Sequence, residues 1–422
     1  MTTFTPDIAA QLRGPEWMRD RRAAALDRLD DIGLPTEAEE IWRYSRISQL
    51  DLDQYAPVDG DGERGVPSGA VAGIDAVGPR TGLLVSRNGR VSHVELDPVL
   101  QERGVVVGDV LDADDGDDLI GSVAASSTDA FTELATAFMT GGALVRVPAG
   151  VVVEEPIVVV HWIDRDGAAV FPRTVVVLGE DAEATVIERV LSADVSAFVD
   201  PVIELDVGDA ALLKYAVVQD LGPRVWQTAY QASRVGRDSE MTSTAVALGG
   251  DYARLRTDAR LEGRGGSSRL RAVYFGAGSG MHDFRTLQDH AAPQTTSDLL
   301  FKGAVAGTAK GVYSGLIRVR KEAPGTNAFQ TNRNLVLSEG AGAESVPNLE
   351  IETNDVRCSH ASAVGPIDEE QRYYLESRGV PPDVAERLIV LGFFSEVLER
   401  LPSQPLAARL RERLAVRLGG GA

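Results

Sequence analysis

Short runs of β-branched residues, separated by turn residues, recur from about Ala143 to Glu352 and constrain the fold more than any other feature of the chain. They include ALVRV, PIVVVHW, RTVVVLG, ATVIERV, PVIELDVG and ALLKYAVV. The run ARLRTDARLE at 253–262 has small or apolar residues and Thr at odd positions and charged residues at even positions, which predicts a strand with one solvent-exposed face. Because no helical periodicity interrupts these runs, the segment predicts an antiparallel sandwich or a β-helix.

The turns between the runs favour the β-helix. Sandwich hairpins commonly use two-residue Asn-Gly or Asp-Gly turns, and few of these separate the runs, the early Asn88–Gly89 and Asp166–Gly167 being the exceptions. The turns are instead rich in Gly and Ala, as in GEDA at 179–182 and GDAA at 208–211. Short strands joined by small turns suit the stacked coils of a solenoid, so we expect a mainly β protein with a β-helix core.

The N-terminal part of the chain shows a helical pattern. WMRDRRAAALDRLDDI predicts a helix that ends at Gly33, and Thr36 with Glu39 forms a capping box that predicts a second helix through EAEEIWRYSRI. Residues 57–82 are rich in Gly, Pro and Asp without a clear period, so we expect a long loop there.

Helical periodicity returns after Pro366. The segments DEEQRYYLESRG, PPDVAERLIVLGFFSEVLERLP and PLAARLRERLAVRL have apolar residues three or four positions apart and predict three helices. These patterns divide the chain into an N-terminal helical segment (1–56), a linker and mixed region (57–142), the β-helix core (143–365) and a C-terminal helical domain (366–422).

Charge and cysteine content exclude several classes of protein. The chain has 42 Lys and Arg against 63 Asp and Glu, a net charge of −21, so we expect neither nucleic acid nor a membrane as a partner. A single cysteine excludes a disulfide framework and any all-cysteine metal site within one chain. The N-terminus lacks the pattern of a secretory signal and no stretch approaches about 18 uncharged apolar residues, which predicts a cytoplasmic protein.

The sharpest candidate for chemistry is the tripeptide Cys358-Ser359-His360, since no H-E-x-x-H, P-loop or G-x-S-x-G motif is present. On a strand, Cys358 and His360 would point to the same face, about 7 Å apart along the backbone. A thiolate and an imidazole are suitable ligands for zinc, copper(I) or an iron–sulfur cluster. Two ligands do not complete such a site, so the others would come from a second chain or from His282 and His290. The alternative is a buried thiol that packs as a small apolar residue beside a hydrogen-bonded histidine.

The remaining histidines have simpler explanations. His161 lies within VVVHW and is expected to be a strand residue without a chemical role. The pairs His282–Asp283 and Asp289–His290 flank FRTLQ and could perform metal or acid–base chemistry. They are explained equally well as polar residues at strand ends. The four arginines of the last predicted helix are either a solvated face or a docking patch for a negatively charged partner.

Three long motifs of the chain resemble one family. They are HDFRTLQDHAAPQTTSDLLFKG, YSGLIRVRKEAPGTNAFQTNRNLVLS and SVPNLEIETNDVRCSHASAVGPIDEEQRYYLESRGV. These motifs resemble the SufB/SufD family of iron–sulfur cluster assembly scaffolds, and GLPTEAEEIWRYSRI is similar to the N-terminal helical segment of SufD proteins. The resemblance, to a SufD-type member, implies a right-handed parallel β-helix flanked by helical domains.

The resemblance also implies partners and a function. A SufD-type chain would be a non-catalytic scaffold subunit that pairs with the paralogue SufB and docks the ABC-type ATPase SufC. A transient iron–sulfur cluster would form where the two β-helices meet. The resemblance further allows a flavin bound at the level of the complex and a homodimer of the isolated chain.

The same resemblance assigns expected roles to individual residues. His360 matches the histidine that SufD contributes to the shared site, and Cys358 matches a cysteine common in SufD. Asn332 stands where SufB-type chains carry a cysteine, and Ala361 stands where they carry a glutamate. This chain therefore lacks the SufB-type ligands, which agrees with the need for a second chain to complete the site.

An apolar stripe on the helix after Pro382 is the expected docking site for the ATPase. Val384, Leu388, Leu391 and Phe394 recur at three- and four-residue spacing, a stripe longer than a small tail can bury alone.

A β-helical enzyme acting on polysaccharide is the alternative function. Such enzymes need paired carboxylates in a cleft and aromatic platforms for sugars. With only 6% aromatic residues, the composition disfavours this alternative.

Overall fold

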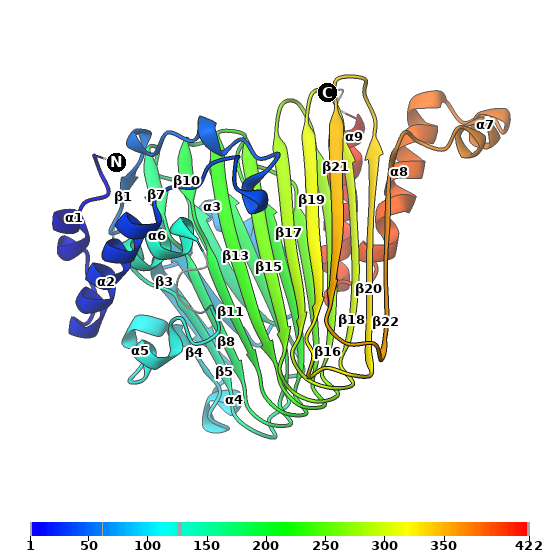
Figure 1. The fold of residues 1–422 in the computed structure, drawn as a ribbon. Helices are drawn as coiled ribbons and strands as arrows, with labels where there is room; N and C mark the ends of the chain where they lie inside the picture. The colour runs from blue at the N-terminus through cyan, green and yellow to red at the C-terminus, as the bar shows by residue number, and fades with distance from the viewer. Residues whose placement is uncertain (1, 61, 125–128, 420–422) are drawn as a thin grey trace.

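Two long, mostly parallel sheets face each other and form a parallel β-helix of about eight coils (Figure 1). The structure, a computed structural model, describes residues 2–60, 62–124 and 129–419. Most coils contribute one strand to each sheet, so consecutive strands alternate between the sheets. The β-helix predicted from the turns and from the resemblance is confirmed.

The strands of the two sheets have the following bounds. The first sheet contains β1 (Ala56–Pro57), β4 (Val106–Asp109), β5 (Ala143–Val147), β7 (Ala168–Val170), β8 (Arg173–Leu178), β10 (Ala197–Val199), β11 (Val202–Val207), β13 (Val225–Val235), β15 (Tyr252–Leu261), β17 (Met281–His290), β19 (Lys310–Val319) and β21 (Gly342–Ile351). The second contains β2 (Gly82–Arg87), β3 (Arg90–Leu96), β6 (Ile157–Ile163), β9 (Glu183–Ser192), β12 (Leu212–Asp220), β14 (Glu240–Ala247), β16 (Ser267–Gly276), β18 (Thr296–Val305), β20 (Thr326–Val336) and β22 (Val356–Gly365). Because β2, β3 and β4 belong to these sheets, the sheets begin well before residue 143.

Stacked side chains fill the space between the sheets. In register, Leu255 of β15 pairs with Phe284 of β17, and both belong to one continuous buried cluster rich in Val, Leu and Ala. Burying a Val, Leu or Phe side chain contributes roughly 1.5–3 kcal/mol. The coils differ in length: Tyr252 pairs with Met281, 29 positions later, and Lys310 pairs with Gly342, 32 positions later. This variation explains why the sequence shows no regular repeat.

The corners of the coils also stack. Asp181, Ala210 and Asp238 occupy corners of successive coils in the left-handed region, with φ between 54° and 57°. The Asp181 N–H donates to the Asp209 carbonyl, and the Ala210 N–H donates to the Arg237 carbonyl. The GEDA and GDAA turns are two of these corners, so their backbone amides are paired between coils as in the strands.

The N-terminal segment covers the outer face of the first sheet (Figure 1). The helices of this segment are α1 (Pro6–Gln11) and α2 (Glu16–Ile32). The mixed region that follows adds α5 (Gly116–Leu119) and α6 (Ala130–Phe138) on the same side, and the short α4 (Pro98–Glu102) precedes β4. The helix predicted to end at Gly33 is confirmed as α2.

The helix predicted after Thr36 does not form. The Thr36 N–H does bond to the Glu39 carboxylate, but only 3₁₀ turns follow, at Glu40–Trp42 and Ile47–Gln49. Tyr44, at φ 65°, interrupts any helix between them. The backbone carbonyls of this segment bind the first sheet instead. Arg254 donates to the Ile41 carbonyl at 2.9 Å, and Arg285 donates to the Arg43 carbonyl at 2.6 Å.

The outer face of β15 is covered, so the prediction of a solvent-exposed face is wrong for much of this strand. The Arg254 guanidinium lies 3.7 Å from the centroid of the Trp42 ring and 2.7 Å from a carboxylate oxygen of Asp283. Tyr252 Oη and Arg285 also donate to Asp283. Arg254 is therefore paired beneath the N-terminal segment, whereas Arg260 and Glu262 at the far end of the pattern pair with each other and stay partly exposed.

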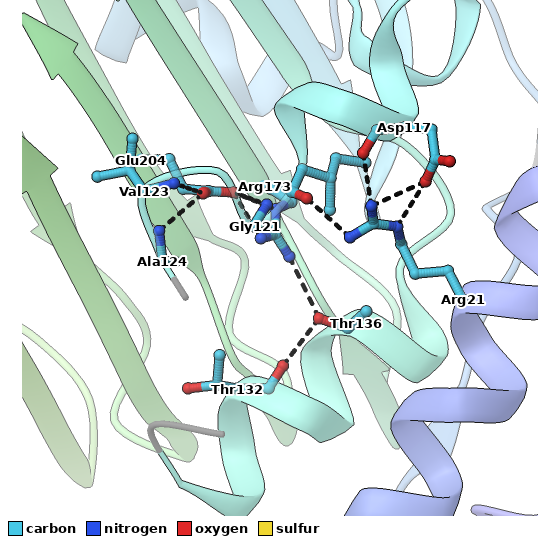
Figure 2. Close-up of polar contacts among 10 residues, drawn as sticks. Arg21, Asp117, Gly121, Val123, Ala124, Thr132, Thr136, Arg173 and Glu204 are labelled. Carbon is cyan, nitrogen blue, oxygen red and sulfur yellow. Dashed lines mark hydrogen bonds and ion pairs between the residues drawn. The ribbon is translucent and has the colours of Figure 1, made fainter. Parts of the chain in front are cut away.

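A second buried ion pair attaches residues 121–124 to the first sheet (Figure 2). Arg173 of β8 donates through Nε and Nη2 to Glu204 of β11, at 3.0 and 2.5 Å. Glu204 also accepts the backbone N–H groups of Gly121, Val123 and Ala124 at 2.8–3.0 Å. Both charged side chains are buried, so this carboxylate is satisfied entirely by protein donors.

Helices from both ends of the chain cover the outer face of the second sheet. They are α3 (Ser68–Asp75), α8 (Pro382–Leu398) and α9 (Gln404–Gly419), while α7 (Glu369–Ser377) extends away from the sheets (Figure 1). The three helices predicted after Pro366 are confirmed. The long loop predicted at 57–82 is wrong, because α3 forms within it and buries Ala70 and Ile74 on the sheet.

Candidate functional site

The C-terminal end of the β-helix is open. β21 and β22 are the last strands of the two sheets, and no other described strand pairs with their free sides. Most residues of β22 are exposed, whereas alternate residues along most of β20, its partner in the sheet, are buried. Free edges carry unpaired N–H and C=O groups that can pair with another chain.

Cys358 and His360 lie on this last strand and share its inner face. In register, Cys358 pairs with Ala328 and His360 with Gln330, two buried residues of β20. The segment predicted as a strand is therefore a strand, and the two candidate ligands extend an interior row of side chains at the open end.

Cys358 is half-buried in a small apolar cluster. It packs against Ile317, Val319, Ala323 and Ala328. Burial raises the pKa of the Cys358 thiol, which favours the neutral form. A metal would therefore have to displace the thiol proton on binding.

His360 is exposed at the open end, and the residue beside it is unusual. Gln330 is 1% exposed, yet neither its amide oxygen nor its amide nitrogen has a hydrogen-bond partner. Gly315 leaves room for it: a Cβ at Gly315 would lie 2.4 Å from the Gln330 Nε2. A hydrogen-bond donor and an acceptor on Gln330 are thus without a partner directly beside His360.

Asn332, by contrast, has its polar atoms occupied. Its Oδ1 accepts from Asn334 Nδ2 at 2.8 Å and from Ser345 Oγ at 2.7 Å. Its Nδ2 donates to the Phe301 carbonyl, and Ser362 Oγ extends the chain of hydrogen bonds to the exposed end. The position at which SufB-type chains carry a cysteine is here part of a structural network.

His282 and His290 do not join the candidate site. Burial lowers the pKa of each to about 4, so both are neutral. His282 Nε2 bonds to the Phe275 carbonyl, and His290 bonds through its two nitrogens to Thr295 and Ser297. These contacts support hydrogen-bonded interior histidines rather than ligands.

Their acidic neighbours face the other side of the sheet. Asp283 pairs with Arg254, and Asp289 pairs with Arg320 at 2.6 Å. Among the described residues, no group of three or more His, Cys, Asp or Glu side chains could hold a metal ion. Cys358 and His360 therefore offer two donors that need completion from outside the described chain.

His161, expected to be a strand residue without a chemical role, lies in an interior polar cluster that no sequence pattern indicated. His161 Nδ1 lies 2.7 Å from Ser86 Oγ, and its Nε2 lies 3.7 Å from Glu188. Tyr215 Oη donates to Glu188 at 2.7 Å. Burial raises the pKa of Glu188 to about 7 and lowers that of His161 to about 4. The members come from different coils, so no local pattern could reveal the cluster.

The predicted docking stripe on α8 is divided between two environments. Phe394 is fully buried against the second sheet, and Leu391 packs at its margin. Val384 is half-buried, and Leu388 is 48% exposed. Phe394 is therefore not available to a partner. Leu388 instead lines a groove of about 1130 Å³ between α7, α8 and the neighbouring strands β20 and β22, with Tyr374, Ile389 and Phe393.

Comparison with protein families decides the identity. The SUF system FeS cluster assembly SufBD core domain matches residues 161–393, and the SufBD protein N-terminal region matches residues 9–159. The chain belongs to the SufBD family. The resemblance found in the sequence motifs is thereby confirmed.

Individual relatives in the SufBD family match along nearly the whole chain. An iron–sulfur cluster assembly SufBD family protein of Mycobacterium tuberculosis is 32% identical over 420 residues, covering 97% of this chain and 94% of that protein. The iron–sulfur cluster assembly protein SufD of Bacillus subtilis is 27% identical, covering 94% and 93%, and that of Escherichia coli is 28% identical, covering 94% and 92%. No helix in the described ranges is long and apolar enough to cross a membrane.

Proposed function

We propose that this chain is a non-catalytic scaffold subunit that pairs with a SufB-type paralogue through the open end of its β-helix. The open edge of β22, with Cys358 and His360 on its inner face, is the observation that supports this role. A paired paralogue would bring the thiolate and carboxylate that this chain lacks at Asn332 and Ala361. The same end could pair two copies of this chain when no paralogue is present.

In this proposal His360 supplies one ligand to a cluster that is cargo of the assembled complex. A neutral imidazole can bind iron through one ring nitrogen while the other donates a hydrogen bond. Gln330, in register beside it, has a free amide oxygen that could accept that bond. Cys358 is a second candidate ligand. Family membership favours this function over the polysaccharide-active alternative.

We expect His360→Ala to reduce iron incorporation into the reconstituted complex at least about tenfold, because a ligand is lost, while the complex still forms. His360 is exposed, so the fold should survive. Cys358→Ser should have a milder effect. The measurement is iron and sulfide content after anaerobic reconstitution of the complex with SufB and SufC.

Ser359→Ala is the matched control, since Ser359 lies on the same strand but on its outer face. Normal cluster content in His360→Ala would contradict the ligand role. Failure of that variant to pair with SufB would show instead that His360 is an interface residue.

The groove beside α8 is the proposed docking site for the SufC ATPase, with Leu388 at its exposed edge. We expect Leu388→Asp to weaken SufC binding at least about tenfold, because a carboxylate would be placed in an apolar contact. Val99→Asp is the control, because Val99 is an exposed apolar residue on the distant α4. The measurement is the affinity of each variant for SufC by calorimetry. Equal affinities for the two variants would show that α8 packs only against its own chain and does not bind SufC.

A further inference from the structure

Two arginines of α9 bind one aspartate where α9 crosses the second sheet, and a third arginine lines the same pocket. The side chain of Asp220 on β12 is 6% exposed, and its carboxylate oxygens lie 2.6 Å from Arg413 Nη2 and 2.9 Å from Arg417 Nη2. Arg189, on the neighbouring strand β9, is the third cation. Its Nη1 donates to the Gly73 carbonyl at 3.2 Å, near the end of α3.

The positive charge of this cluster is not balanced. Arg413 and Arg417 share the Asp220 carboxylate, and Arg189 lines the same pocket as Asp220. The other two charged residues of the pocket, Arg409 and Glu412, pair with each other, so two positive charges remain in excess in a chain whose net charge is −21.

Arg189 is 5% exposed, and its Nε has no hydrogen-bond partner. Burial lowers the pKa of Arg189 to about 10 and also lowers the pKa of Arg417, while the nearby Asp220 carboxylate acts in the opposite direction on both. Arg189 donates to a neutral carbonyl and makes no ion pair within the described residues. A buried cation in that state is costly unless a ligand supplies the opposite charge.

A pocket of about 530 Å³ lies against these groups. Arg189, Arg413 and Asp220 line it together with Trp162 and Leu191 of the sheet. The side of α3 that faces the pocket carries only small residues, Gly69, Ala72 and Gly73. The volume is within the range of small-molecule sites.

We propose that this pocket binds a phosphate group, with Arg189 and Arg413 as its principal ligands. A phosphate dianion would neutralise the two excess charges, whereas a carboxylate would leave one. Guanidinium groups suit phosphate oxygens, because their planar N–H donors match the spacing of those oxygens. Trp162, whose Nε1 is held by Asp164, provides an apolar wall for an organic group attached to the phosphate. The source is either free phosphate or a phosphate monoester.

The test is calorimetric titration of the full chain with inorganic phosphate, with AMP and with acetate, at constant ionic strength. We expect phosphate and AMP to bind and acetate to bind at least about tenfold more weakly. Tighter binding of AMP than of phosphate would identify a monoester site that uses Trp162. Equal affinities would identify the phosphate group alone as the ligand. Equal binding of acetate, or no binding of either phosphate compound at about 10 mM, would overturn the proposal.

Arg189→Gln should weaken phosphate binding at least about tenfold, since it removes a charge-assisted donor. Arg413→Gln provides a second measurement in case the buried substitution impairs folding, because the Arg413 side chain is 51% exposed. Arg411→Gln is the matched control: Arg411 is also on α9, but it pairs with Glu399 outside the pocket. An equal loss in Arg411→Gln would show a general charge effect and would contradict the proposed site.

Discussion

Replacing Glu204 by alanine is expected to lower the free energy of unfolding by about 3–5 kcal/mol, because it leaves the buried Arg173 without its partner. The three N–H groups of Gly121, Val123 and Ala124 would also lose their acceptor (Figure 2). An unsatisfied buried donor costs about 1–3 kcal/mol unless water reaches it. Denaturant unfolding would measure the global effect, and hydrogen exchange at residues 121–124 would measure the local one.

Asp206→Ala is the matched control for this prediction. Asp206 lies two residues away on the same strand, β11, and pairs with Arg234 at 2.6 Å, but the Arg234 side chain is 40% exposed. Such an exposed pair contributes at most about 1 kcal/mol. If Glu204→Ala and Asp206→Ala had equal effects on stability, the ion pair in Figure 2 would not hold residues 121–124 against the first sheet.

Replacing Glu188 by glutamine is expected to stabilise the protein at high pH. Because the pKa of Glu188 is raised from 4.5 to about 7 by burial, the folded state holds this proton more tightly than the unfolded state. The resulting stability is fully present below about pH 4.5 and is lost as the pH rises through about 7. The wild type should therefore lose up to about 3 kcal/mol relative to Glu188→Gln between pH 4.5 and 8.

The geometry makes glutamine a suitable replacement at this position. Its amide oxygen can accept the hydrogen bond from Tyr215 Oη, as the carboxylate does at 2.7 Å. The measurement is the difference in unfolding free energy between variant and wild type at several pH values. Glu183→Gln, at an exposed position of β9, should show no such pH dependence. A constant difference for Glu188→Gln would mean that Glu188 is ionised in the folded protein throughout.

Local patterns in the sequence predict the architecture of this protein and the strand that carries its candidate site. Period-two runs with small turns predicted a β-helix, and apolar residues three or four positions apart predicted α2, α8 and α9. The spacing of Cys358 and His360 predicted a shared face, because alternation along a strand is a local property. The SufBD resemblance added an expected role for His360, which remains a prediction.

Which strand faces are covered and which charges are paired depends on contacts between segments that are distant in the sequence. Arg254 reaches the carbonyl of Ile41 across 213 positions of sequence, and Arg417 reaches Asp220 across 197. Such contacts give β15 a buried charged face and create the arginine pocket beneath α9. The capping box at Thr36 failed for the same reason: a local preference of about 1 kcal/mol is outweighed by packing and hydrogen bonds to a distant sheet. Local periodicity predicts the secondary structure of a segment. It does not predict whether the outer face of a β-helix is covered, because that depends on which distant segment packs on it.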